Sequence, residues 1–386
     1  MSKIEFAKEI VMKVESPDNV LQTYIEPFMS WLDILRKRVE RAKLNFEEFL
    51  RDTGFVEGSY LREESQRRLL TVILRDFEDI ERRIYISVDT FLPLILFWNS
   101  QKSRGETKRQ HKLLMCFILD LLQLCRLSES MMAIIGEDYA CLPLEWGKVR
   151  KHIVFGIYSE IQNLRKWVLL AHELGHAYYD QNYEKINSYV TPQVIRRLVE
   201  NRPPALDPRD FESIVYTWAQ HWIPEFVADC FAVKTLGPAF VAQFMVAALD
   251  SQPDRIEATH PPPNLRMRFM MKILDSLCLS DINVNSYRKM WRSYAHTISR
   301  PGSLFIVHDD VVEAALEGID LIVNEKPIEK KWDEVLEAKE ALSLASIPNQ
   351  DLISIISALA ISEPNLDYSS LYETLLKRYA SNSYIP

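Results

Sequence analysis

The chain has 386 residues, of which 47% are hydrophobic and 26% charged, and its net charge is −8. This length allows a large hydrophobic core or two to three domains. The acidic balance, without a concentrated basic stretch that carries interleaved aromatic residues, argues against a nucleic-acid-binding protein.

Location is indicated by hydropathy and by cysteine usage. No run of about twenty apolar residues is present, so we expect no transmembrane segment. The first nine residues lack the apolar core of a signal peptide. Five widely spaced cysteines form no Cys-x-x-Cys pair, which is typical of reduced thiols. We therefore expect a cytoplasmic protein.

Residues 1–140 are predicted to form a helical domain without chemistry of its own. Apolar residues recur at helical spacing after Ser16 and again over 61–84, where a charged face lies opposite them. Pro27 predicts a kink or a break in the first helix. The polar stretch 99–110 predicts a loop before an apolar helix at 112–127.

The pattern changes after residue 140. Residues 152–158 are rich in β-branched and aromatic side chains and predict a strand. A short helix is expected after Thr191 and Pro192, followed by a turn at 201–204. We expect the segment that contains them to wall one side of a cleft.

Residues 172–176 read His-Glu-Leu-Gly-His, the HExxH pattern. On a helix His172 and His176 share a face and can direct two imidazoles at one zinc ion. Glu173 lies about 100° away, where it can act as a general base on water. Two exposed surface histidines would be the alternative, but the preceding residues 168–171 are apolar. Gly175 costs a helix about 1 kcal/mol relative to alanine, which suggests a close approach at this position.

The third metal ligand is predicted to be Glu225. Pro224 fits the first turn of a helix that ends at Gly237. Asp229 lies one turn after Glu225 and can accept the free N–H of a ligating imidazole. His221 competes for the ligand position, but Pro224 argues against one continuous helix through both residues.

A third segment, residues 259–268, contains His260-Pro-x-x-x-x-Arg266 before a helix expected from Asn264 to about Leu277. In this order the three segments resemble the gluzincin zinc metallopeptidases, and in particular the CAAX prenyl endopeptidase and HtpX branch. The resemblance implies that His260 and Arg266 stabilise the oxyanion of the tetrahedral intermediate. Lesser candidates for that role are Tyr178, Tyr179 and Tyr216.

The resemblance covers the middle of the chain and implies a zincin-like catalytic core. In such folds a strand before the active helix forms the edge along which a peptide lies extended. That branch is typically membrane-embedded, and this chain lacks such a segment, so the chamber for lipidated tails does not carry over. A peptide or protein substrate is expected, without nucleic acid.

After residue 280 the sequence predicts amphipathic helices near 283–299, 308–323, 328–345, 349–361 and 366–380. These form either a surface for a protein partner or a plain helical bundle. The predicted fold class is mainly α (α+β), with a zincin-like core and a small β-sheet between helical regions. The predicted domains are residues 1–140, 141–280 and 281–386.

The predicted function is that of a zinc-dependent endopeptidase. Zn²⁺ is held by His172, His176 and Glu225, with Asp229 in support and Glu173 as general base. Two alternatives remain open. One is a protease of the ImmA/IrrE type that cleaves a single regulatory partner, although that pattern usually has Asn at the position of Asp229. The other is a non-catalytic zinc scaffold, which has no need of Glu173.

Overall fold

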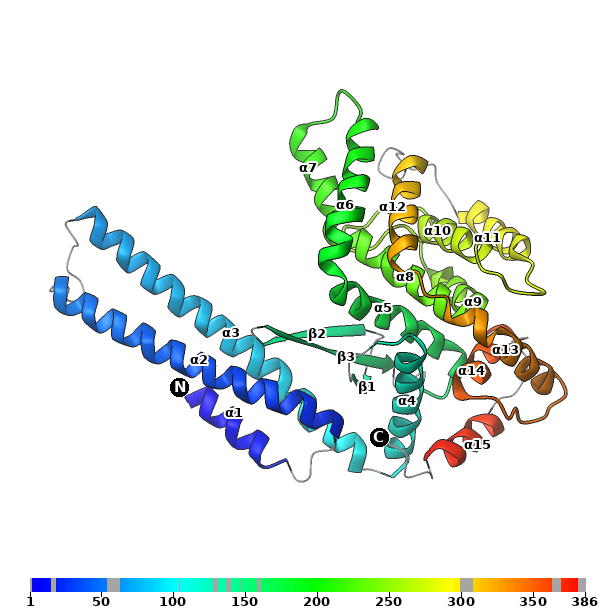
Figure 1. Ribbon diagram of the computed structural model, residues 1–386, viewed down its shortest axis with the longest axis horizontal. Helices are drawn as coiled ribbons and strands as arrows, with labels where there is room; N and C mark the ends of the chain where they lie inside the picture. Colours follow the sequence, from blue (N-terminus) through cyan, green and yellow to red (C-terminus); the bar gives the residue numbers. More distant parts are fainter. Residues whose placement is uncertain are drawn as a thin grey trace.

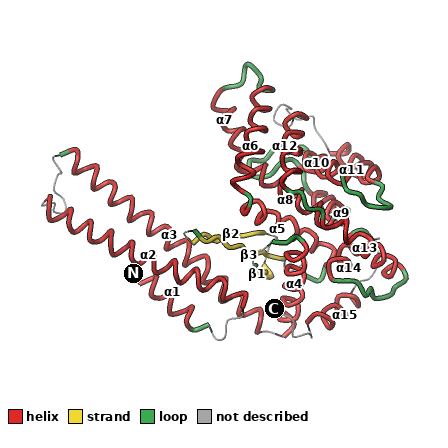
Figure 2. Tube along the Cα trace, viewed as in Figure 1, coloured by secondary structure: helices red, strands yellow, loops and turns green. Residues whose placement is uncertain are grey.

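The computed structural model describes residues 2–14, 19–53, 63–103, 105–127, 131–136, 140–146, 148–157, 161–298, 308–362 and 369–380. Most of these residues are helical, and a small sheet lies near the middle of the molecule (Figures 1 and 2). The mainly α prediction is therefore confirmed. Among the described residues no helix combines the length and the apolar character that a bilayer crossing requires.

The elements of the N-terminal part are α1 (Ser2–Met12), α2 (Asn19–Thr53), α3 (Glu64–Ser103), α4 (Gly105–Leu124), β1 (Met132–Gly136), β2 (Ala140–Trp146), β3 (Val149–Ile157) and the 3₁₀-helix η2 (Leu164–Leu169). The central elements are α5 (Leu170–Gln181), α6 (Tyr183–Glu200), α7 (Pro208–Thr217), the π-helical segment η3 (Trp218–Trp222), α8 (Ile223–Leu236), α9 (Pro238–Ala247), the 3₁₀-helix η4 (Ala248–Asp250) and α10 (Pro263–Asp275). The remaining helices are α11 (Val284–Ile298), α12 (Asp309–Ile322), α13 (Pro327–Ser343), α14 (Leu352–Ala360) and α15 (Ser369–Ala380).

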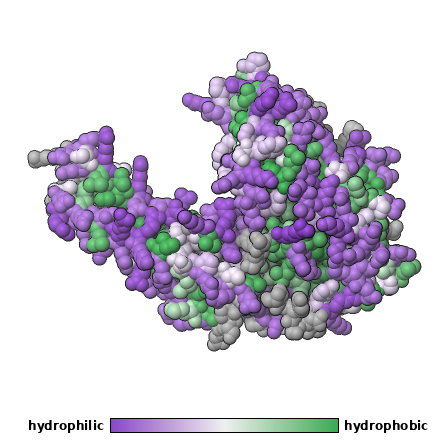
Figure 3. All heavy atoms as spheres, in the orientation of Figure 1, coloured by the Kyte–Doolittle hydropathy of each residue, from purple (hydrophilic) through white to green (hydrophobic). Residues whose placement is uncertain are grey.

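Helices α2 and α3 form a long antiparallel hairpin that projects from the rest of the molecule (Figure 1). Arg38 of α2 forms ion pairs with Asp76 and Asp79 of α3 at 2.6 and 3.2 Å. Helix α2 runs through Pro27, so it is not split there. The space-filling view shows an open hollow between this hairpin and the α6–α7 projection (Figure 3).

The loop predicted at 99–110 is wrong, because α3 continues to Ser103 and α4 begins at Gly105. One polar residue of this stretch, Gln101, is buried and bonds to the sheet. The Gln101 side chain donates to the Ile135 carbonyl at 2.7 Å and accepts from the Ile135 N–H at 3.1 Å. The polar side chain of Gln101 therefore reflects a contact with a strand edge.

The sheet has the strand order β1-β3-β2, with β1 parallel and β2 antiparallel to β3. The strand predicted at 152–158 corresponds to β3, but it is central and not an edge strand. Strands β1 and β2 were not predicted. β1 is a short apolar run that periodicity cannot distinguish from helix, and β2 contains Pro143, which usually argues against a strand.

The two outer strands differ in how their free edges are covered. Along β1, backbone groups bond to side chains of neighbouring helices: Tyr24 accepts from the Met132 N–H at 2.9 Å, and His111 contacts the Ala133 carbonyl at 3.0 Å. Along β2, residues 140, 141 and 143 line a cavity. The edge that faces this cavity is thus β2.

Helices α7 and α8 belong to one continuous helical run, joined by the π-helical segment η3. The Ile223 N–H bonds to the Trp218 carbonyl, five residues earlier. This widened turn accommodates the ring of Pro224, which would otherwise clash with the carbonyl four residues back. Pro224 lies in the first turn of α8, as predicted, but the expectation that it interrupts the helical run is wrong. α8 ends before Gly237, whose φ is +57°.

Helix α8 is the centre of the core. All of its residues except Pro224 are buried, in agreement with an apolar character on every face. It packs on α5, α10, α12 and α13. The C-terminal helices α11 to α15 lie close to their predicted ranges, so these predictions are confirmed. β1 precedes the predicted domain boundary at 140 but belongs to the central sheet.

Candidate metal centre

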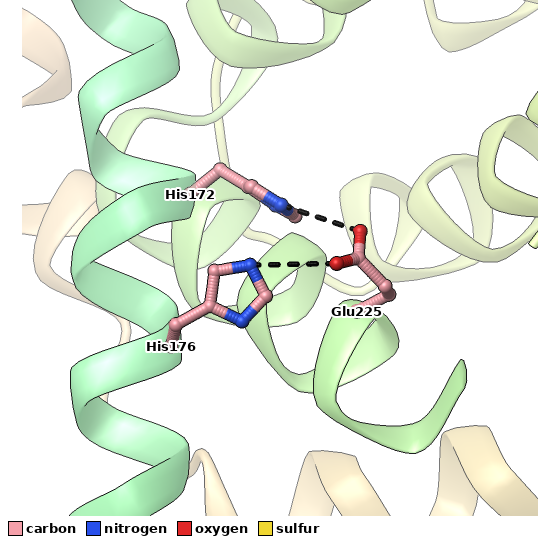
Figure 4. A group of neighbouring side chains, drawn as sticks. All are labelled: His172, His176 and Glu225. Carbon is pink, nitrogen blue, oxygen red and sulfur yellow. Dashed lines mark ion pairs between the residues drawn. The ribbon is translucent and has the colours of Figure 1, made fainter. Parts of the chain in front are cut away.

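Two histidines of α5 and one glutamate of α8 point their side chains at one another (Figure 4). His172 Nε2 lies 3.4 Å from Glu225 Oε2, and His176 Nε2 lies 3.4 Å from Glu225 Oε1. One ligand atom from each residue lies within 4.8 Å of the others. Ligand bonds of about 2.0–2.1 Å in a tetrahedral zinc site place ligand atoms about 3.4 Å apart. The group could therefore hold a metal ion.

Glu225 behaves as a carboxylate that requires a cation. Its side chain is almost fully buried, and its Oε2 lies 3.4 Å from His172 Nε2 and 3.2 Å from Arg266 Nη1. Burial of a carboxylate is costly unless cations lie beside it. Burial alone would raise the pKa of Glu225, but Arg266 and His172 outweigh it and hold this pKa well below its usual range. The side chain is therefore an anion that faces two imidazoles.

Asp229 lies behind His172, on the side away from Glu225. It is fully buried, and its Oδ1 lies 3.0 Å from His172 Nδ1. An N–H on Nδ1 that donates to this carboxylate leaves the Nε2 lone pair available to a metal. Burial lowers the pKa of His172, but hydrogen bonds to Asp229 and Glu225 outweigh it and raise this pKa to about 10. Carboxylates that stabilise a proton on this imidazole also stabilise a metal cation.

His176 is the second imidazole, one helical turn further along α5. Burial and the neighbouring His172 lower its pKa to about 4. It is therefore neutral at physiological pH, which is the form that binds metals.

Glu173 lines the same cavity but does not belong to the ligand group. Burial raises the pKa of its carboxyl above the usual value, although His172 and a hydrogen bond with the Cys141 backbone act against this. A carboxylate beside a metal site with a raised pKa is suited to accept and return a proton.

The cavity has a volume of about 620 Å³ and lies between β2, α5 and the start of α8. Phe240 and Phe244 of α9 form an apolar wall, and the Phe240 ring stacks on that of His172. Sequence reasoning missed these aromatic residues. It also missed the His152–Asp180 pair, whose Nε2 and Oδ2 atoms lie 2.9 Å apart at the cavity surface. Asp180 follows His176 by four residues, so the sequence already placed it on the same face of the helix as the two histidines.

His260 and Arg266 both line the cavity but differ in exposure. The His260 side chain is 55% exposed, and its Nε2 lies 3.7 Å from Glu225 Oε1. Arg266 is 11% exposed and donates from Nε and Nη2 to the two Asp229 oxygens at 2.8 and 2.6 Å. α10 begins at Pro263, so His260 belongs to the preceding loop.

The competing candidates lie elsewhere. The His221 ring packs on that of Tyr216 and does not belong to the ligand group. The π-helical turn before α8 holds one residue more than an α-helical turn, which rotates His221 away from the face of Glu225. Tyr178 donates to the Ile322 carbonyl at 2.8 Å, and of the three tyrosines named above Tyr179 alone lines the cavity.

No family model, no curated protein and no solved structure matches this chain. The site is therefore defined by its own geometry: two imidazoles and a carboxylate that converge, and an enclosed glutamate beside them.

Proposed function

We propose that the protein is a zinc-dependent metallopeptidase that hydrolyses internal peptide bonds. The observation that carries the proposal is the placement of Glu173 in the cavity, beside His172, His176 and Glu225 but outside their group. A site that served only stability would need the ligands and no adjacent base.

The chemistry follows from these positions. A zinc ion, when bound by the three ligands, supplies Lewis acidity toward the scissile carbonyl and lowers the pKa of water. Glu173 takes the proton of the attacking water and delivers it to the leaving amine. His260 reaches the cavity next to Glu225 and can donate to the developing oxyanion.

The cavity favours an extended peptide as substrate. The backbone of Cys141 hydrogen-bonds Glu173, so the polar backbone groups of this residue face away from β3. The backbone of Pro143, two residues later in the strand, faces the same way. A peptide can add to such an edge by main-chain pairing while Phe240 and Phe244 contact its side chains. The hollow next to the hairpin leaves room for a protein substrate (Figure 3).

The proposal includes a zincin-like core and a cytoplasmic location. The five cysteines are all described, and none of them forms a disulfide. A narrower form of the proposal is a protease that cleaves one regulatory partner. The helices after residue 280 would bind that partner. Asp229 contacts His172 through a carboxylate, whereas ImmA/IrrE-type proteins usually have Asn at this position. This difference argues against the narrower form.

Purified protein tests the proposal directly. We expect about one zinc per chain by mass spectrometry and cleavage of a fluorescein-labelled unfolded protein such as casein. Chelation should abolish cleavage, and added zinc should restore it. Bound zinc without cleavage of casein or of peptides from a proteome-wide digest would favour the scaffold alternative. Protein that binds no zinc would contradict the proposal.

A further inference from the structure

The guanidinium of Arg266 is held by the carboxylates around the metal site. Arg266 lies in the first turn of α10, where its N–H bonds to the Pro262 carbonyl at 3.1 Å. Its Nε and Nη2 donate to the two oxygens of Asp229, and its Nη1 lies 3.2 Å from Glu225 Oε2. Each of its three nitrogens thus contacts one of these two carboxylates.

Arg266 offsets part of the negative charge that would attract a metal ion. The carboxylates of Asp229 and Glu225 contribute −2, and Arg266 contributes +1. Arg266 carries its positive charge at 11% side-chain exposure, next to a fully buried aspartate. Such a buried pair is costly unless its geometry and hydrogen bonds are good. Its presence so close to a cation site requires a function other than attraction of metal.

The contacts of one Asp229 oxygen indicate this function. Asp229 Oδ1 contacts both Arg266 Nη2, at 2.6 Å, and His172 Nδ1, at 3.0 Å. Two parallel N–H···O bonds fix the plane of a carboxylate. The plane of Asp229 in turn fixes the imidazole of His172. The third contact, from Nη1, restrains the Glu225 carboxylate.

We propose that Arg266 is a positioning residue that orients His172 and Glu225 before the metal binds. The inference rests on the proposed metal site and changes one part of it. The sequence resemblance implied that Arg266 donates to the oxyanion. The observed contacts assign its donors to Asp229 and Glu225, and leave His260 as the donor that reaches the cavity.

Arg266→Lys separates the two roles, because lysine keeps the charge and loses the planar pair of donors. We expect zinc affinity to fall 10- to 100-fold, as for other residues that orient metal ligands. Affinity is measured by competition with a chromophoric chelator. The visible absorption of the cobalt-substituted protein should change as well, since it reports ligand geometry. Casein cleavage at saturating zinc should fall less than zinc affinity does, because the three ligands remain.

Arg255→Lys is the matched control. Arg255 lines the adjoining cavity with His260, is 65% exposed, and pairs with Glu257 at 3.0 Å. This variant should keep the wild-type zinc affinity and cobalt spectrum. If Arg266→Lys keeps them too and loses 10²- to 10³-fold in turnover, Arg266 is an oxyanion donor and the proposal is overturned.

A double-mutant cycle covers the case in which Arg266→Lys does not fold. Arg266→Gln is compared with wild type and again in the Asp229→Asn background, where a neutral amide pair replaces the ion pair. Coupled residues give non-additive effects. In the Asp229→Asn background we expect Arg266→Gln to change zinc affinity less than about twofold. Additive losses would overturn the proposal. Wild-type protein without zinc affinity would overturn the metal site as well, whereas failure to cleave casein bears on the peptidase function alone.

Discussion

Gly175 of α5 lies so close to Ala228 of α8 that a Cβ built on the glycine would stand 2.5 Å from the Ala228 Cα. This contact sets the distance between the helix that carries both histidines and the helix that carries Glu225. Close backbone packing therefore explains why a glycine stands at position 175, although glycine is unfavourable inside a helix.

Gly175→Ala should therefore damage the metal site, although alanine favours helix by about 1 kcal/mol. Backbone atoms of α8 must move, so we expect a loss of about 1–3 kcal/mol in stability and weaker zinc binding. Urea denaturation and chelator competition measure the two. The control is Gly156→Ala, whose Cβ would meet only the Leu114 side chain, at 3.5 Å. Unchanged zinc affinity in Gly175→Ala would contradict the assigned packing.

Glu173→Gln tests the general base. The amide keeps the shape of the side chain but cannot accept the proton, so peptide hydrolysis should fall by at least about 10²- to 10⁴-fold. Zinc content should remain about one per chain by mass spectrometry. Loss of zinc in this variant would make Glu173 a ligand.

Glu225→Ala and Asp229→Ala should differ in severity. Removal of Glu225 takes away a ligand atom and should strip zinc from the protein. Removal of Asp229 leaves all three ligands and should weaken zinc affinity by about 10- to 100-fold. His221→Ala serves as control, because its ring packs on Tyr216 away from the group. Zinc loss in the control with retention in Glu225→Ala would show that the third ligand is misassigned.

His260→Ala should lower turnover by about 10²- to 10³-fold, because a donor to the oxyanion acts mainly on the transition state. Its zinc content and fold should change little. Steady-state kinetics on labelled casein provide the measurement. Turnover near that of wild type would remove His260 from the site, and loss of zinc would make it a metal ligand.

Asp120 gives a prediction on pH dependence outside the site. Burial, together with the nearby Asp351, raises the pKa of Asp120 to about 6 from an ordinary 3.8. The folded state thus keeps a proton that the unfolded state has lost, so this contribution to stability is present below the unfolded pKa. It is lost as the pH rises through about 6.

Asp120→Asn should therefore stabilise the protein at pH 7.5 by on the order of 1–2 kcal/mol and change little at pH 4, as measured by chemical denaturation. Substitution of the exposed Asp333 by asparagine is the control. Destabilisation of Asp120→Asn at both pH values would show that the carboxylate is held by a favourable contact.

The local signals in the sequence were sufficient for part of the structure. Helices with strong apolar periodicity, such as those after residue 280, lie where their patterns placed them. The spacing of His172 and His176 also predicted a shared face, because residues four apart on a helix always have one. Glu225 was found through its proline and its distance from Asp229, and the structure brings it to the histidines.

The remainder depended on contacts between distant segments. Gln101 and His111 resemble loop residues until β1 is known to lie beside them. The π-helical turn that accommodates Pro224 has no sequence signature comparable to a cap. The contacts of Arg266 join residues far apart in the chain, so its motif gave a position but not its partners.

The edge of β2 that faces the cavity also bears on self-association. An uncovered strand is a template for pairing with a second copy of the same protein, and such pairing leads to aggregation. Pro143 lies at this edge and has no N–H to offer. A continuous ladder with another sheet is interrupted there, while a short peptide needs only a few bonds. If a peptide pairs with β2 as proposed, Pro143 limits that pairing to a short stretch and also interrupts pairing with a second copy of the protein.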